Sequence, residues 1–276
     1  MKQASFKFYG LVAAVFWLAG EMTGGHIAPP VALSEIQPSP HGAIHIHYYQ
    51  SKATGEMRRL HVYTPPSYDN DAAARFPVLY LLHGSGEDDA TWTTLGNAHS
   101  ILDSLVAQGK AKPMIVVMPN GQAVPNTPEA RGRNTEIFRR DLLGDVLPFI
   151  EANYRVKPDR WNRAIAGLSM GGGQALTIGL NHPELFAWVG GMSATINAPE
   201  QTFATALGNA KATNTNYKLL WLAIGKDDFL LKTNQRFDKL LSATGIKHTF
   251  NVTEGNHSWP VWRRYLAEFA PLLFNQ

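Results

Sequence analysis

The chain has 276 residues, a hydrophobic fraction of 45% and a charged fraction of 17%, which is enough apolar material for one substantial core without a second domain. Its formal net charge of +3 is small, and no run of lysine or arginine indicates a nucleic-acid partner. The absence of cysteine excludes disulfides, thiol catalysis and cysteine-ligated zinc.

The amino terminus has the pattern of an export signal. Lys2 and Lys7 precede an apolar run at residues 9–19, which is too short to span a bilayer but has the length of the apolar part of a secretory signal. Residues 1–28 are therefore predicted to be a signal peptide, the alternative being an anchor that is never cleaved. The protein is expected to be secreted or periplasmic, without stable membrane association once the signal is removed. Proline-rich residues 29–42 are predicted to be a linker.

The rest of the chain alternates between strand and helix patterns. Residues 43–50 and 57–63 alternate in polarity, so they are predicted to form a hairpin at an antiparallel sheet edge. Continuous apolar runs predict strands buried on both faces at residues 76–82, 114–118, 163–166, 187–191 and 219–224. Helices are predicted at about residues 90–108, 136–153, 171–181, 230–243 and 258–273. This alternation predicts one α/β domain over residues 43–276, with a mostly parallel sheet covered on both faces and ligands at its carboxyl edge.

One pentapeptide has the pattern of a serine nucleophile. Gly167-Leu168-Ser169-Met170-Gly171 follows an apolar run and precedes a helical segment, which is the strand, turn and helix setting of such a serine. A serine turned outward there lies in a strained bend, where larger side chains at both glycine positions would collide with neighbouring backbone. The alternatives are a glycine-rich structural turn and a phosphate cradle. The absence of a following Gly-Lys-Ser/Thr disfavours the cradle.

A serine hydroxyl needs a base, and the base needs an orienting partner. His257 is the candidate base because it ends the segment Val252-Thr253-Glu254-Gly255-Asn256-His257, which comes just past a further predicted strand, and because it precedes the terminal helix. His182, in a helix-ending context, and His248, within a predicted strand, are expected to be structural. Three carboxylates that follow strands are candidates for the partner: Asp227, Asp228 and, as a lesser alternative, Glu254.

Attack on an ester places negative charge on its carbonyl oxygen, and that charge requires preorganised N–H donors. One predicted donor is the backbone N–H of Met170, directly after the candidate nucleophile. The other is the backbone N–H of Ser85, in the turn His83-Gly84-Ser85-Gly86 that follows a predicted strand. The predicted site uses no metal and no cofactor.

Five segments, in order between about residues 43 and 273, match one protein family. They are Tyr63-Thr64-Pro65-Pro66-Ser67-Tyr68, Pro77-Val78-Leu79-Tyr80-Leu81-Leu82-His83-Gly84, Gly167-Leu168-Ser169-Met170-Gly171-Gly172, Gly225-Lys226-Asp227-Asp228 and Gly255-Asn256-His257. Together they resemble the Putative esterase family, which includes feruloyl esterases of carbohydrate esterase family 1, S-formylglutathione hydrolases, enterochelin esterases and mycolyltransferases.

This resemblance implies an α/β-hydrolase fold and a catalytic triad of Ser169, Asp228 and His257. It favours Asp228 over Asp227 because the family's acidic residue typically stands three positions after a glycine. The loop after the His-Gly turn reads Ser-Gly-Glu-Asp-Asp, which is more acidic than the glycine-rich versions of the family. A different pocket rim is therefore expected.

The resemblance and the export signal together imply a secreted serine carboxylesterase that acts on plant cell-wall polysaccharide esters, most simply feruloyl or acetyl esters. The alternatives are hydrolysis of S-formylglutathione or another small ester or thioester, and acyl transfer of the mycolyltransferase type. A binding module without activity would lack a triad member, and none is missing. The partner is thus an ester substrate, small or linked to polysaccharide. Tryptophans that could stack on it, if they are not core residues, are Trp92, Trp161, Trp259 and Trp262.

Overall fold

The computed structural model describes residues 40–275 of the chain. The predicted signal peptide at residues 1–28 lies outside the described residues. The same holds for the predicted linker at residues 29–42, except for its last three positions. Both assignments stay predictions.

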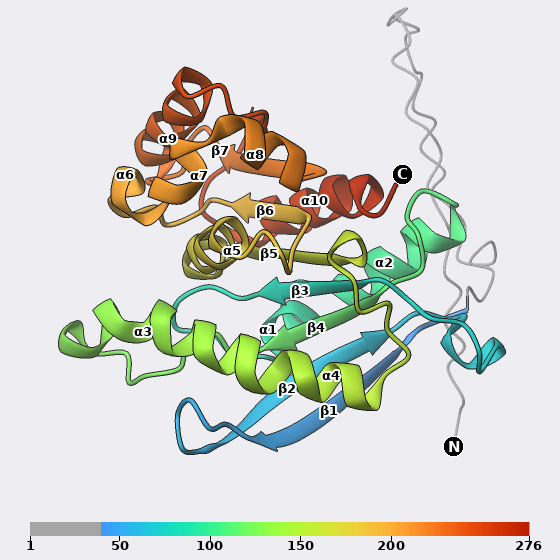
Figure 1. The fold of residues 1–276 in the computed structure, drawn as a ribbon. Coiled ribbons are helices and arrows are strands. Elements are labelled where there is room, and N and C mark those ends of the chain that lie inside the picture. The colour runs from blue at the N-terminus through green and yellow to red at the C-terminus, as the bar shows by residue number, and fades with distance from the viewer. Residues whose placement is uncertain (1–39, 276) are drawn as a thin grey trace, which may run out of the picture. The chain divides into compact units, whose positions relative to one another are not determined.

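An eight-stranded sheet runs through the described residues (Figure 1). Its strands are β1 (Ala43–Gln50), β2 (Met57–Thr64), β3 (Val78–Leu82), β4 (Ile115–Pro119), β5 (Arg163–Leu168), β6 (Trp188–Met192), β7 (Leu219–Gly225) and β8 (Thr249–Thr253). They lie in the order β1-β2-β4-β3-β5-β6-β7-β8. β1 pairs antiparallel with β2, and β2 antiparallel with β4, whereas all other pairs are parallel. The predicted edge hairpin and mostly parallel sheet are confirmed.

Side-chain burial explains which strands lie in the middle. β3, β4, β5 and β6 consist of buried residues throughout, as expected for strands covered on both faces. β1 is mostly exposed or partly buried, and it lies at the edge. The arrowheads of β3 and β6 point the same way in Figure 1. The carboxyl ends of the parallel strands thus share one edge, where ligands bind in sheets of this kind.

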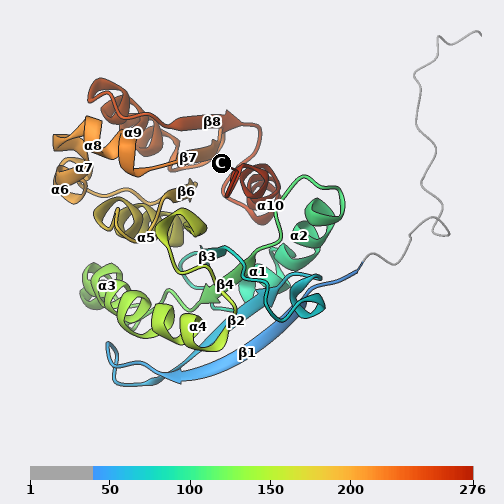
Figure 2. The ribbon, with the colours of Figure 1, turned by 45° about the vertical axis from the view of Figure 1, so that its right-hand side comes forward.

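Helices cover both faces of the sheet (Figure 2). They are α1 (Thr91–Thr94), α2 (Ala98–Ala107), α3 (Pro128–Asp141), α4 (Leu147–Asn153), α5 (Ser169–Asn181), α6 (Pro199–Thr202), α7 (Ala204–Gly208), α8 (Ala210–Asn216), α9 (Leu231–Ala243) and α10 (Trp259–Phe269). One hydrophobic cluster joins the sheet to α3, α4, α5 and α9, and a second joins its other face to α2 and α10. Among residues 40–275, no helix has the length and apolar character needed to cross a membrane.

Several helices differ from their predictions. The helix predicted at residues 90–108 is split into α1 and α2, because Asn97 adopts a left-handed backbone with a φ of 51°. The helix predicted at 136–153 begins earlier, at Pro128, and is interrupted by a π-helical turn, η3 (Leu142–Val146). The sequence does not predict α6, α7 and α8, whose short segments are rich in alanine, threonine and asparagine and lack a long apolar period.

Candidate active site

Ser169 lies at the sharp turn where β5 ends and α5 begins. Its backbone φ is 52°, in the left-handed region that residues with a side chain seldom adopt. The flanking glycines are needed for close approach. A Cβ on Gly167 would lie 2.5 Å from the backbone of Gly171, and one on Gly171 would lie 2.4 Å from the carbonyl oxygen of His83. The predicted strand, turn and helix are present, and the helix starts at Ser169 rather than two residues later.

Three side chains from different strand ends meet at this turn. The hydroxyl of Ser169 lies 3.0 Å from His257 Nε2, and His257 Nδ1 lies 2.8 Å from Asp228 Oδ2. Asp228 is 4% exposed, and its second oxygen accepts the backbone N–H of Leu230 at 2.9 Å. A carboxylate that accepts the Nδ1 proton leaves Nε2 as a lone-pair acceptor facing the hydroxyl. His257 is therefore positioned to accept the proton of the Ser169 hydroxyl without any movement of the two side chains.

The other candidate acids and histidines lie elsewhere. Asp227 is exposed, and Glu254 pairs with Lys226 at 2.7 Å. His182 caps the carboxyl end of α5, as expected. His248 was predicted to lie within a strand, but β8 begins one residue later, and the imidazole lies 2.8 Å from the carbonyl oxygen of Ile246 and 2.9 Å from Asp238 Oδ1. None of these four predicted alternatives shares a hydrogen bond with Ser169.

Aromatic rings surround the imidazole of His257. The ring of Trp262 meets it at 90°, with centroids 4.9 Å apart. Trp259 contacts Trp262 and Trp92 edge-on, at centroid distances of 5.3 Å and 5.1 Å. Trp92 and Trp262 are buried and Trp259 is half-buried. Three of the four tryptophans considered as stacking surfaces thus form a cluster behind the histidine, while Trp161 lies in η4 (Arg160–Asn162), at the start of β5.

A cavity of about 500 Å³ opens beside Ser169. Its walls come from the loop after β4, α3, α5 and the segment after β6. Ser85 and Met170 line it together with Ser169, so both residues predicted to supply oxyanion donors lie at the same cavity as the candidate nucleophile. Most other lining side chains are neutral amides and hydroxyls. Among the described residues that line it, Arg131 alone is charged.

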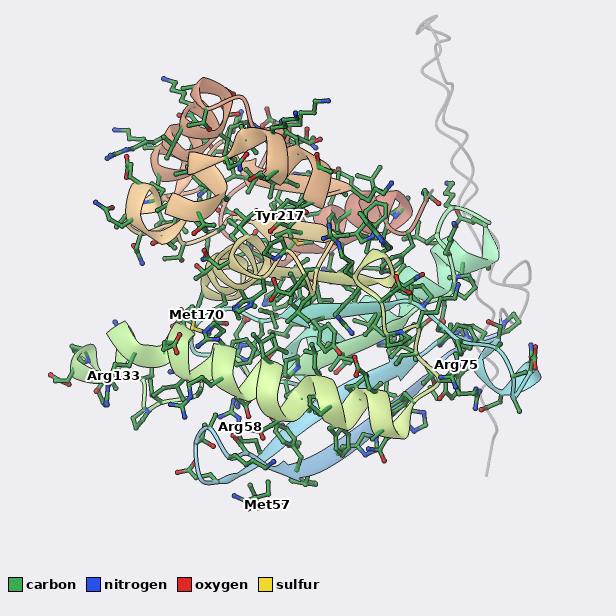
Figure 3. All side chains as sticks on the ribbon, viewed as in Figure 1. Met57, Arg58, Arg75, Arg133, Met170 and Tyr217 are labelled. Carbon is green, nitrogen blue, oxygen red and sulfur yellow. The ribbon has the colours of Figure 1, made fainter. Side chains whose placement is uncertain are left out.

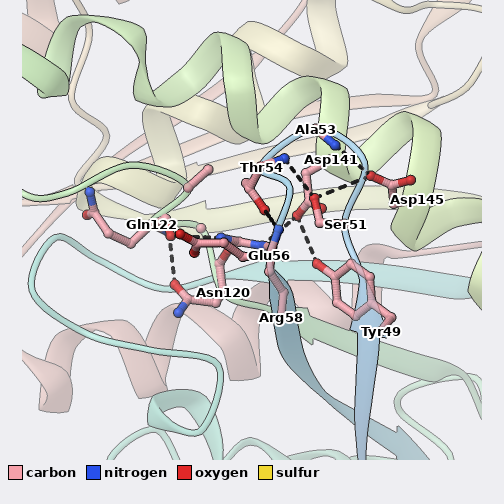
Figure 4. Close-up of polar contacts among 12 residues, drawn as sticks. Tyr49, Ser51, Ala53, Thr54, Glu56, Arg58, Asn120, Gln122, Asp141 and Asp145 are labelled. Carbon is pink, nitrogen blue, oxygen red and sulfur yellow. Dashed lines mark hydrogen bonds and ion pairs between the residues drawn. The ribbon is translucent and has the colours of Figure 1, made fainter.

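A buried network holds the loop after β4, which forms one wall of the cavity (Figure 4). From β2, Arg58 donates to Asp141 Oδ2 at 3.0 Å, to the carbonyl of Gln122 at 3.1 Å and to the carbonyl of Asn120. Tyr49 donates to the same Asp141 oxygen at 2.8 Å, and its burial beside that carboxylate raises the pKa of Tyr49. The sequence gives no sign of this network, since its members come from separate elements and lie as far apart as 92 residues.

Three side chains fix Gly121 in the middle of that loop. His83 Nε2 accepts the Gly121 N–H at 2.8 Å, while Asn134 and Gln174 donate to the Gly121 carbonyl at 3.0 Å and 2.9 Å. The Asn134 amide also lies 3.6 Å from the sulfur of Met170. Figure 3 shows Met170 near α3, the helix that carries Asn134. The turn after Ser169 and the cavity wall are thereby joined.

In the loop after the His-Gly turn, Ser85 lines the cavity, whereas the carboxylates Glu87, Asp88 and Asp89 do not. Glu87 accepts the backbone N–H of Gly84 at 2.7 Å with one oxygen and the indole N–H of Trp259 at 3.0 Å with the other. Asp89 is 2% exposed and lies 2.6 Å from the Nδ1 of His61. The extra carboxylates of this loop anchor it to β2 and α10.

Known proteins resemble this chain in sequence and in fold. Residues 51–273 match the model of the family described as Putative esterase. An endo-1,4-beta-xylanase/feruloyl esterase from Xylanibacter ruminicola is 36% identical over 239 residues, which cover 85% of this chain and 32% of that protein. This chain thus spans about a third of the length of that relative.

Solved structures of esterases resemble this chain in fold. A ferulic acid esterase superposes with a TM-score of 0.74 at 29% identity, covering 85% of this chain and 99% of that chain. The S-formylglutathione hydrolase of Staphylococcus aureus gives a TM-score of 0.71 at 20% identity, over 87% of this chain and 99% of its own, which is a likeness of fold alone. The α/β-hydrolase fold is confirmed, and the chain belongs to the Putative esterase family.

Proposed function

We propose that this chain is an exported serine carboxylesterase that removes feruloyl or acetyl groups from plant cell-wall polysaccharide, through an acyl-enzyme on Ser169. The supporting observation is the position of His257, hydrogen-bonded at once to Ser169 and to the buried Asp228. The choice of ester rests on the relatives, which include a xylanase/feruloyl esterase and a ferulic acid esterase.

In the proposed acylation step, His257 Nε2 takes the proton of Ser169 as Oγ attacks the ester carbonyl. The carbonyl oxygen becomes negatively charged and accepts the backbone N–H groups of Ser85 and Met170. The amino-terminal end of α5 adds its positive dipole at the same point. The bond to the alcohol oxygen then breaks, and His257 returns the proton to that oxygen.

In the second step, water replaces the alcohol. His257 takes a proton from the water as it attacks the acyl-enzyme, and then protonates Ser169 when the acid leaves. Asp228 keeps Nδ1 protonated in both steps and stabilises the imidazolium that forms between them. Its burial strengthens this interaction, because few water molecules can screen the pair.

A cavity of about 500 Å³ suits an acyl group as large as an aromatic acid. Its neutral amide and hydroxyl lining provides partners for phenol and methoxy oxygens. Acyl transfer to a sugar hydroxyl is the second candidate, because a mycolyltransferase from Mycobacterium bovis is 29% identical over 64% of this chain. Both reactions pass through the same acyl-enzyme. They differ in the acceptor that takes the acyl group from Ser169, which is water in hydrolysis and a sugar hydroxyl in acyl transfer.

The proposal is tested by comparing methyl ferulate, acetylated xylan and S-formylglutathione as substrates of the purified protein. We expect turnover of at least one of the first two, and kcat/KM for S-formylglutathione well below it. Ser169→Ala should lower kcat by at least about ten-thousandfold with an unchanged melting temperature, whereas the exposed Ser242→Ala should retain full activity. A Ser169→Ala protein that keeps most of its rate would contradict the proposed mechanism, and a preference for S-formylglutathione would contradict the proposed substrate.

A further inference from the structure

Phe229 is an exposed aromatic side chain at the edge of the candidate site. It follows Asp228 directly, and 75% of its surface is exposed. Its ring lies 4.5 Å from that of His257, centroid to centroid, with the planes tilted by 51°. By contrast, Trp262 on another side of the same imidazole is only 5% exposed. The ring of Phe229 therefore contacts the histidine with part of its surface and offers the rest to solvent.

The proposed reaction determines which part of an ester substrate contacts the ring of Phe229. His257 Nε2 must protonate the departing alcohol oxygen, so the alcohol lies on the histidine side of Ser169. The cavity beside Ser169 is lined by Ser85 and Met170, and neither Phe229 nor His257 lines it. The acyl group is then held in the cavity, and the alcohol extends over the surface that carries Phe229.

We propose that Phe229 is a stacking platform for a sugar ring of the alcohol part of the ester. This inference rests on the proposed function, which it makes more specific. One face of a pyranose or furanose ring presents C–H groups, which pack on an aromatic face and remove apolar surface from water. Exposed Asp227 and Asn256, next in sequence to Asp228 and His257, add polar groups of the kind that sugar hydroxyls bind.

A sugar suits this surface better than a lipid alcohol. An alkyl chain would need a continuous apolar patch, but the loop after β7 that carries Phe229 also carries the exposed Lys226, which pairs with Glu254 at 2.7 Å. A single flat ring among polar groups is the usual composition of a carbohydrate contact. The other role open to Phe229 is to shield the hydrogen bond between His257 and Asp228 from water. Loss of this shielding would lower the rate of hydrolysis of every ester by the same factor.

The two roles are separated by a pair of esters that share one acyl group. Methyl ferulate and a feruloylated arabinoxylan oligosaccharide differ only in the alcohol. We expect Phe229→Ala to lower the ratio of kcat/KM for the sugar ester to kcat/KM for the methyl ester by about fivefold. Phe229→Tyr keeps the ring and should keep the ratio. Tyr48→Ala removes another exposed aromatic side chain, 65% exposed on β1, and should leave both values unchanged.

The inference would be overturned if Phe229→Ala left the ratio of kcat/KM for the sugar ester to kcat/KM for the methyl ester unchanged. This holds whether kcat/KM falls equally for both esters, as shielding requires, or falls for neither. Retention of the ratio by Phe229→Ala with normal hydrolysis of methyl ferulate would leave the proposed esterase function standing. If the wild-type protein hydrolyses neither feruloyl ester, the proposed feruloyl esterase function fails first, and the sugar platform fails with it. A melting curve of each variant checks that the exposed substitution leaves the fold intact.

Discussion

At the scale of single residues, the site depends on side chains that touch no substrate. Glu87 joins the turn that carries Ser85 to the helix that follows His257, because its two oxygens accept the N–H of Gly84 and the indole N–H of Trp259. The proposed oxyanion donor and the proposed base are thereby held at a fixed separation. We regard Glu87 as a positioning residue for both.

Replacing Glu87 with glutamine tests this role. A carboxamide has one acceptor oxygen, so Glu87→Gln can keep only one of the two hydrogen bonds and should lower kcat by about tenfold, the effect of roughly 1.4 kcal/mol. KM and the melting temperature should change little. The measurement is steady-state hydrolysis of p-nitrophenyl acetate, with the exposed Glu56→Gln as the control. A variant with wild-type kcat would show that the carboxylate does not position the site.

The sequence predicts the residues of the site whose signal is local. Ser169 lies inside a short motif with a recognisable setting, and His257 follows a strand end, so both are found without knowing the fold. Glu87 and Arg58 were missed, because their partners lie on other elements and no spacing in the sequence reveals such contacts. Glu87 was noticed only as part of an unusually acidic loop, from which a different pocket rim is expected, and its hydrogen bonds to Gly84 and Trp259 were missed.

At the scale of elements, the turn between β5 and α5 sets the geometry. Gly171→Ala would place a Cβ 2.4 Å from the carbonyl of His83, which neither backbone can avoid without moving. We expect this change to destabilise the protein by about 2–3 kcal/mol and to abolish activity. Gly144→Ala in η3 meets nothing within 4 Å and should stabilise by about 0.5–1 kcal/mol. Urea unfolding measures both, and equal effects would contradict the close approach seen at Gly171.

The buried pair of Arg58 and Asp141 joins β2 to α3 and to the cavity wall. Arg58→Met leaves Asp141, which is fully buried, without its cation. We expect a loss of about 3–5 kcal/mol in the free energy of unfolding and a higher KM, because the wall loses its anchor. Arg139→Met removes a solvent-exposed pair with Glu136 and should cost less than about 1 kcal/mol. Urea unfolding measures the loss of free energy of unfolding in each variant. A similar loss in both would contradict the idea that the Arg58–Asp141 pair matters more because it is buried.

Strands were easier to predict than helices. The buried strands are continuous apolar runs between turns, and their predicted bounds differ from the observed ones by at most two residues at either end. The break at Asn97 and the π-helical turn in η3 depend on tertiary packing, which periodicity does not report. The early start of α3 at Pro128 was missed because its first turns are polar and exposed.

At the scale of the whole molecule, residues 40–275 include the complete sheet, the helices on both of its faces and the three side chains of Ser169, Asp228 and His257 that meet at its carboxyl edge. The contacts of Pro38–Gln276 form one unit of their own, and the family match begins at residue 51. A variant that lacks residues 1–39 is therefore expected to retain kcat/KM within about twofold. Assay of both forms on p-nitrophenyl acetate checks this. A large loss of activity would show that the removed segment contributes to catalysis.

The proposed role of Ser169 is tested most directly by covalent labelling. A fluorophosphonate probe should react with the Ser169 oxygen, releasing fluoride, and peptide mass spectrometry should find a single adduct on the peptide that contains Ser169. Esterase activity should fall in proportion to labelling, and Ser169→Ala should take up no probe. Complete labelling with activity retained, or inactivation by an adduct on another residue while Ser169 stays unmodified, would contradict the proposed mechanism.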